Sequence, residues 1–229
     1  MVRHSRLETQ SLVGFLGMCP LFRTVSPESL TAFLRSARLR RVHRGDMLFR
    51  QGDPPTRVYV LVEGAGKLVR SAPKGHQVVL ALLQPGDVFG FVDLFGRADQ
   101  TYTAEIVDEG RIVSWPQEVM KQIVERHPII ITNALRMMAN RVEAYWLRIE
   151  DLTTVPVEQR VARAVLRLTS GTDRQLSIVH QDLAQFVGTT PPTLSRILHR
   201  WKTRGLVEVG RAAIRVRKLG ALRAIAADP

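Results

Sequence analysis

The strongest constraint on the fold is a heptad repeat in residues 131–152. Apolar side chains recur there at alternating intervals of four and three residues, the spacing that lines one face of a coiled-coil helix. A helix of this length extends about 32 Å, which is long for a helix covered by one small domain. We therefore expect the same helix of a second chain to pack against it; packing on the chain's own β-domain is the alternative. The predicted dimer interface consists of Ile131, Leu135, Met138, Val142, Tyr145, Ile149 and Leu152.

Before this helix, the sequence has the pattern of a small antiparallel β-domain. Short alternating or apolar runs are separated by turns in which glycine stands beside aspartate or proline, because glycine readily adopts the positive φ of tight turns. The motif GDMLF at 45–49 recurs as GDVF at 86–89, which predicts two similar corners. Regular short strands of this kind are typical of a sandwich or barrel. The predicted strands are 58–64, 67–71, 77–83 and 111–115, with a turn at EGAG, 63–66, between the first two.

The N-terminal segment LVGFLGMC predicts a short amphipathic helix with Leu12, Phe15, Leu16 and Cys19 on one face. A lipoprotein signal is the alternative, but the apolar run is short and interrupted by glycines. Cys19 is the one cysteine of the chain, which excludes an intrachain disulfide and an iron–sulfur cluster held by four cysteines. A lone thiol suits a reducing cytoplasm, and no run approaches the ~18 apolar residues of a membrane span. We expect a cytoplasmic protein with no membrane partner.

Positive charge is concentrated in the C-terminal third of the chain. The net charge is +12, and residues 155–229 hold 13 Lys and Arg against 5 Asp and Glu. Such an excess favours a polyanionic partner, usually nucleic acid. A solvated basic surface without such a partner is the plain alternative.

Residues 178–201 have the spacing of a helix-turn-helix motif. Ala184 is small where a second helix would cross, Gly188 suits the turn, and Leu194 and Ile197 suit the apolar anchors of the second helix. An ordinary helical hairpin inside a core is the alternative. We call the second helix, predicted at residues 191–204, the reader helix.

The reader helix is predicted to have an apolar back and a front rich in hydrogen-bond donors. Pro191 and Pro192 suit its first turn, where the N–H that proline lacks would be unpaired, and Thr190 can cap it. The segments LVEV and AIRVR predict a two-stranded wing after it, from which Arg211, Arg215 and Lys218 can reach flanking phosphates. Donors on the front suit base edges and phosphates. The predicted DNA-binding residues are His180, Thr189, Thr190, Pro192, Thr193, Ser195, Arg196, His199, Arg200 and Arg217.

The predicted fold class is therefore α+β, with a jelly-roll-like antiparallel β-roll, a long dimerisation helix and a C-terminal winged helix-turn-helix. The predicted domains are 1–127, 128–154 and 155–229, with a hinge at 153–160. In this order, and in segments 40–70, 82–95 and 182–209, the chain resembles the CRP/FNR family of bacterial transcription regulators over nearly its whole length. The resemblance implies that the roll senses a small effector and that a homodimer binds a palindromic promoter site, with RNA polymerase as a further partner.

The sequence departs from the cyclic-AMP branch of that family where the nucleotide would bind. The branch's Gly-Glu pair falls on Gly90-Phe91, its Arg-Ser-Ala set on Tyr102-Thr103-Ala104, and a Thr-Ser pair of its dimer helix on Tyr145-Trp146. The ribose-binding acid and the phosphate-binding arginine are thus both missing, and we do not expect cyclic AMP to be the effector. Such a pocket suits a haem, a hydrophobic metabolite or no ligand. The predicted effector pocket consists of Gly90, Phe91, Tyr102, Thr103, Tyr145 and Trp146.

Other functional classes have less support in the sequence. We find no paired carboxylates near histidines, no phosphate loop and no metal-ligand cluster, so neither a catalytic site nor a metal site is expected. A haem- or gas-sensing regulator of the same fold is one alternative, with His76 and Cys19 as candidate axial ligands. A DNA-binding protein with an inert roll and no effector is another.

Overall fold

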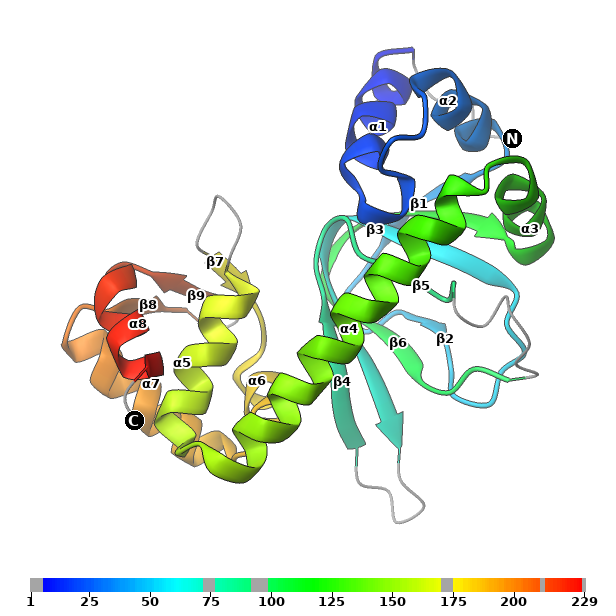
Figure 1. Cartoon of the computed structure of the whole chain (residues 1–229). Coiled ribbons are helices and arrows are strands. Elements are labelled where there is room, and N and C mark those ends of the chain that lie inside the picture. The colour runs from blue at the N-terminus through cyan, green and yellow to red at the C-terminus, as the bar shows by residue number, and fades with distance from the viewer. Residues whose placement is uncertain (1–5, 72–76, 92–98, 170–174, 211–212, 228–229) are drawn as a thin grey trace. The chain divides into compact units, whose positions relative to one another are not determined.

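The computed structural model describes residues 6–71, 77–91, 99–169, 175–210 and 213–227, drawn in colour in Figure 1. The chain groups into two compact units, the first made of residues 1–75 and 82–142 and the second of residues 76–81 and 143–229. His76 and Arg211 of the sequence predictions lie outside the described residues. Among the described helices, none combines the length and the apolar character needed to cross a membrane.

The predicted antiparallel β-roll is confirmed. The strands described are β1 (Arg38–Val42), β2 (Met47–Phe49), β3 (Arg57–Ser71), β4 (Gln77–Leu83), β5 (Val88–Phe89) and β6 (Thr103–Pro116). The sheet follows the order β1-β6-β3-β4, with β2 paired to β6 and β5 paired to β3 (Figure 1). The long β3 and β6 form its centre, because each pairs with the other along most of its length.

The turn predicted at EGAG, 63–66, is wrong. Strand β3 continues through these residues while its register against β6 shifts, as in β-bulges. Gly64 has a φ of 87°, and a Cβ at this position would lie 2.6 Å from the carbonyl oxygen of Glu109. A Cβ at Gly110 would overlap the carbonyl of Glu63 in the same way. The glycines therefore let two backbones approach closely across a bulge, and they do not reverse the chain.

One turn recurs at three corners of the roll, in the Gly-Asp pairs 45–46, 52–53 and 86–87. Each glycine has a positive φ, of 88°, 89° and 95° respectively. Each aspartate carboxylate accepts a hydrogen bond from the backbone N–H three residues earlier, at 3.0, 2.8 and 2.8 Å. The aspartate N–H also donates to the carbonyl of that earlier residue, at 3.0 Å in each case. The first and third of these turns lead into β2 and β5, the two similar corners that the repeated motif predicts.

Helices pack over one end of the roll and close its core (Figure 1). Leu12, Leu16 and Cys19 are buried there and Phe15 is half-buried, which confirms the predicted amphipathic face. The helices are α1 (Arg6–Met18), the 3-10 helix η1 (Pro20–Phe22), α2 (Pro27–Arg35) and α3 (Gln117–Arg126).

Trp115 lies fully buried in this core. Its Nε1 donates a hydrogen bond to the carbonyl of Phe33 at 2.9 Å, and its ring centroid lies 5.6 Å from that of Phe22. A single side chain thus joins β6 to helix α2 and to η1.

The long helix α4 (Ile129–Thr154) contributes residues to both units. After it come α5 (Val157–Leu168), β7 (Gln175–Ser177), α6 (His180–Phe186), α7 (Pro191–Thr203), β8 (Val207–Val209), β9 (Ala213–Val216) and α8 (Leu219–Ala227). Strands β8 and β9 pair antiparallel as the predicted wing, and β7 adds to β9 as a third strand. Helix α8 is not anticipated by the sequence analysis; it packs on α5, whose Gln159 and Arg163 donate to the carbonyl of Ala226.

We predict that Trp115→Phe lowers the free energy of unfolding by about 1–3 kcal/mol, because the buried hydrogen bond from the indole to the carbonyl of Phe33 is lost and the smaller ring leaves a void. The measurement is urea unfolding followed by circular dichroism. Trp146→Phe is the matched control, since this side chain is 68% exposed, and it should change stability by less than about 0.5 kcal/mol. Equal effects of the two substitutions would contradict the prediction.

Candidate DNA interface and effector cavity

The reader helix is α7, and its first turn is built as predicted. Thr190 is the N-cap residue, and its Oγ1 accepts a hydrogen bond from the N–H of Thr193 at 3.4 Å. Pro191 and Pro192 occupy the first two helical positions, where a missing N–H breaks no helical hydrogen bond. The apolar back of the helix is buried and consists of Leu194, Ile197, Leu198 and Trp201.

Both helices of the motif end at a glycine. Gly188 follows α6 and Gly205 follows α7, each with a φ of 66°. After Gly188, the N–H of Thr189 donates to the carbonyl of Ala184 at 2.9 Å, and the corresponding bond after Gly205 is also 2.9 Å. These bonds satisfy carbonyls that the helix ends leave free, and the left-handed conformation they require favours glycine. The predicted turn at Gly188 is therefore confirmed.

The front of the reader helix presents a short chain of hydrogen bonds that leads to Arg196. Thr190 Oγ1 donates to Thr193 Oγ1 at 3.0 Å, and Arg196 Nη2 donates to the same hydroxyl at 3.2 Å. Arg196 itself is exposed. The remaining predicted contacts on this front are exposed or half-buried: Thr189, Pro192, Ser195 and His199.

Three other predicted DNA contacts are paired with a carboxylate or partly buried. Arg200 forms an ion pair of 2.8 Å with Glu158 on α5, and Arg217 pairs with Glu208 across the wing. His180 is half-buried, and its Nε2 is buried without a hydrogen-bond partner in the described structure. Each pair uses one Nη of the guanidinium, so both arginines keep further N–H donors for DNA.

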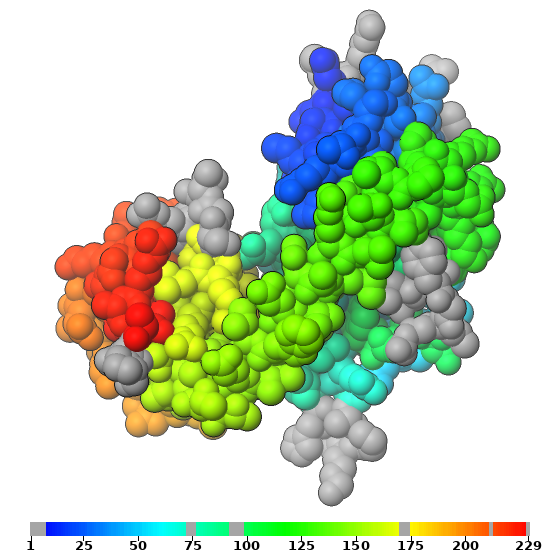
Figure 2. Space-filling model, viewed as in Figure 1, coloured from blue at the N-terminus to red at the C-terminus, as the bar shows by residue number. Residues whose placement is uncertain are grey.

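Helix α4 carries an exposed apolar face. Six of the seven residues in the predicted seam are exposed, among them Leu135 at 62% and Ile149 at 60%. Ile131 differs, because it is half-buried against the core of the first unit. Leu147, 45% exposed, enlarges the apolar surface and was not anticipated. Helix α4 is visible along most of its length in the space-filling view (Figure 2).

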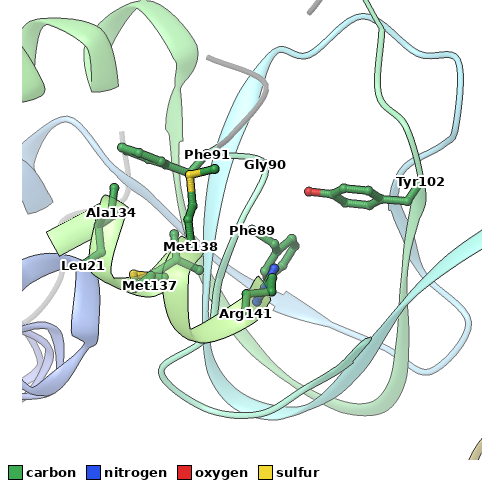
Figure 3. Close-up of a pocket in the computed structure, with 10 residues that line it drawn as sticks. Leu21, Phe89, Gly90, Phe91, Tyr102, Ala134, Met137, Met138 and Arg141 are labelled. Atoms are coloured by element: carbon green, nitrogen blue, oxygen red, sulfur yellow. The ribbon is translucent and has the colours of Figure 1, made fainter. Parts of the chain in front are cut away.

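A cavity of about 40 Å³ lies in the first unit between the roll and α4 (Figure 3). Of the predicted pocket, Gly90, Phe91 and Tyr102 line it. Thr103 is not among the lining residues; its hydroxyl accepts a hydrogen bond from the N–H of Gln51 at 3.0 Å. Tyr145 and Trp146 are exposed on the part of α4 that belongs to the second unit.

Aromatic rings fill the interior of the roll beside this cavity. Tyr59 and Phe89 stack with centroids 5.3 Å apart, and Phe49 lies 5.8 Å from Tyr59 and 5.6 Å from Tyr102. Phe91 is buried in the core that the N-terminal helices cover. Tyr102 and Phe91, which stand where the cyclic-AMP branch has its arginine and its acid, thus pack against apolar side chains.

Among the described residues that line the cavity, Arg141 is the charged one, and sequence reasoning missed it. Arg141 lines the cavity from α4 (Figure 3). The sequence feature that could have identified it is its position directly before the seam residue Val142. Asp87 in the third Gly-Asp turn has a pKa raised by burial, against the lowering effects of its hydrogen bond from Gln84 and of the positive charge of Arg141.

Cys19 is placed unfavourably for a haem ligand. It is buried in the core, its Sγ donates to the carbonyl of Phe15 at 3.4 Å, and burial raises the pKa of the thiol to about 12. A metal-binding thiolate needs a lowered pKa. The other candidate axial ligand, His76, lies outside the described residues.

Comparison with known proteins agrees with this architecture. Residues 39–127 match the family model of the cyclic nucleotide-binding domain, and residues 159–225 match the Crp-like helix-turn-helix domain. The chain is 30% identical to the cyclic AMP receptor protein of Thermus thermophilus over 208 residues, which cover 90% of this chain and 96% of that protein. The chain belongs to the CRP/FNR family of transcription regulators.

Other CRP/FNR proteins show similar likeness. The global nitrogen regulator of Nostoc sp. PCC 7120 is 28% identical, covering 76% of this chain and 83% of that protein. The crystal structure of the Thermus thermophilus catabolite activator protein is 30% identical with a TM-score of 0.52, covering 90% of this chain and 98% of that one. FixK2 from Bradyrhizobium japonicum shares the fold, with a TM-score of 0.74 at 20% identity and coverage of 84% and 98%.

Family membership confirms that this protein is a CRP/FNR-type transcription regulator with a DNA-binding helix-turn-helix. The effector does not follow from membership, since the names of the related proteins refer to cyclic AMP in one case and to nitrogen in another.

Proposed function

We propose that this CRP/FNR regulator is a homodimer that reads a palindromic DNA site with helix α7, and that its effector is not cyclic AMP. The observation that carries the proposal is the exposed apolar face of α4, since a soluble chain rarely leaves such a face uncovered. We also infer a cytoplasmic location and RNA polymerase as a further partner, as for a regulator that acts on promoters.

The dimer follows from the spacing and the exposure of the seam together. The repeat of four and three residues lets two helices interdigitate along their length, and the exposed fractions of 62% and 60% at Leu135 and Ile149 leave these side chains available. Two-fold symmetry then presents two copies of α7, which a palindromic site matches.

Recognition by α7 follows from its front. Arg196 has the forked guanidinium that binds guanine at two atoms in the major groove. Pro191 and Pro192 supply no N–H to a phosphate, and both are exposed, so we infer that the first turn reads shape or a thymine methyl group.

The effector argument rests on charge. A cyclic nucleotide carries a phosphate charge that must be paired when it is buried. The position of the family's phosphate-binding arginine is Tyr102, which packs on Phe49, and Arg141 approaches from α4 instead. Because no acid that could bind the ribose is among the described lining residues and the arginine comes from a different element, we infer an effector other than cyclic AMP, or none. The filled interior of the roll specifically favours the second candidate function, a regulator that binds DNA without an effector.

The dimer has a direct test in the double substitution Met138→Glu and Val142→Glu. Because four carboxylates would face one another in the seam, we expect the dimer dissociation constant to rise about 100-fold or more, measured by analytical ultracentrifugation. Asn140→Glu places a charge on an exposed position of the same helix outside the seam and should leave the dimer intact. An unchanged native mass in the double variant would exclude α4 as the interface.

Base reading is tested by Arg196→Ala on DNA sites selected from a random library. If Arg196 reads guanine, its loss should weaken binding by roughly 1–3 kcal/mol and relax one base-pair position per half-site. Arg217→Ala should instead weaken all sequences alike and reduce the salt dependence of binding. Equal losses on selected and random DNA in both variants would make Arg196 a phosphate contact.

Calorimetric titration with cyclic AMP and cyclic GMP tests the effector proposal. We expect no binding heat, and we expect the untreated protein to bind its selected site. A micromolar affinity for either nucleotide that also tightens DNA binding would disprove the proposal.

A further inference from the structure

The sequence predicts a hinge at 153–160, at the corner between α4 and α5. The side chain of Arg160 bridges this corner. The guanidinium of Arg160 donates to three backbone carbonyls: Nη1 to Val155 at 2.8 Å, Nε to Val187 at 3.1 Å and Nη2 to Gly188 at 3.2 Å. Val155 follows α4 directly, whereas Val187 and Gly188 form the turn between α6 and the reader helix. Arg160 therefore ties the end of the long helix to the turn of the DNA-binding motif.

Two side chains of α4 make further bonds to the same domain. Asp151 is buried, and its carboxylate accepts hydrogen bonds from Arg163 at 2.8 Å and from Arg167 at 2.6 Å, both on α5. Arg148 places its guanidinium 4.3 Å from the ring centroid of Phe186 on α6. These contacts connect the last turns of α4 to both α5 and α6.

The last seam residue also touches the turn. A Cβ at Gly188 would lie 2.5 Å from Cδ2 of Leu152, so this side chain lies directly against the backbone of the turn. We call the contacts of Arg160, of Asp151, of Arg148 and of Leu152 the corner brace. All of them lie within the second unit.

We propose that Arg160 is a positioning residue for DNA recognition. Through the corner brace it fixes the direction of the reader helix relative to the last turns of α4, and so it sets the separation of half-sites that the regulator accepts. This inference rests on the homodimer proposed above.

The physical reason is geometric. In a homodimer joined along α4, each reader helix is carried at the end of an α4 helix, so the angle at the corner sets the distance between the two readers. Helix-turn-helix dimers read half-sites about 34 Å apart, and one inserted base pair moves a half-site by about 3.4 Å and turns it by about 35°. With the corner brace intact, the reader helix cannot shift to meet the displaced half-site. Without the brace, the angle between α4 and α5 can adjust to it.

The experiment compares binding to the selected site with binding to versions that have one base pair inserted or removed at the centre, measured by fluorescence anisotropy. We expect the wild type to lose about tenfold or more in affinity, the size of a mismatched base pair. Arg160→Ala should bind the original site more weakly but lose less than about threefold when the spacing changes. Arg160→Lys keeps the charge without the three-way fork and should behave like the alanine variant.

Arg223→Ala is the matched control, since it removes the same charge from an exposed position on α8; it should keep the wild-type spacing preference. A general loss of stability would weaken all spacings in proportion, so an unchanged ratio in Arg160→Ala overturns the inference. If that variant does not fold, Asp151→Asn loosens the brace from α4 and must relax the spacing preference instead. A wild type with no spacing preference would refute the two-half-site proposal itself, whereas a preference retained by every brace variant would refute only the role of Arg160.

Discussion

Helix α4 packs on the roll with one side, leaves an apolar face exposed on another, and contributes residues to both units. On one side, Ile130 and Ala134 are buried in the core of the roll domain. Asn133 anchors this side, because its amide donates to the carbonyls of Leu21 at 3.1 Å and Arg23 at 2.7 Å. On the other side, the seam stays exposed. The packing that fixes α4 to the roll thus leaves a hydrophobic face whose burial needs a further surface.

Within the DNA-binding unit, hydrogen bonds and glycine caps fix the position of the reader helix. Glu158 binds both Arg200 and the indole of Trp201, so one carboxylate orients the reader helix from α5. The glycine caps at 188 and 205 end the two helices of the motif where the chain must change direction. Rigid placement of α7 by buried and hydrogen-bonded groups is what direct base readout requires, since each contact demands accurate geometry.

The roll shows why a shared fold does not by itself specify a ligand. The family model of a cyclic nucleotide-binding domain covers residues 39–127, yet the interior of this roll is occupied by the stacked rings of Tyr59 and Phe89 and by Phe49. Arg141 brings charge to the cavity from a position that the resemblance does not mark. Function resides in such site residues, and the fold does not specify them.

The sequence by itself determined the order of the main elements, although it missed α8 and divided β3 at EGAG. Heptad spacing marked the seam of α4, Gly-Asp pairs marked the corners of the roll, and the pattern from Ala184 to Ile197 marked the reader helix, because each of these signals depends on near neighbours in the chain. Only the tertiary structure decided that EGAG is a bulge, that Arg200 is paired with Glu158, that Arg141 lines the cavity and that Arg160 braces the predicted hinge. Those outcomes depend on which distant backbone or side chain lies opposite, as when Glu63 meets Gly110 or Arg160 meets Gly188, and local patterns of polarity carry no record of such pairings.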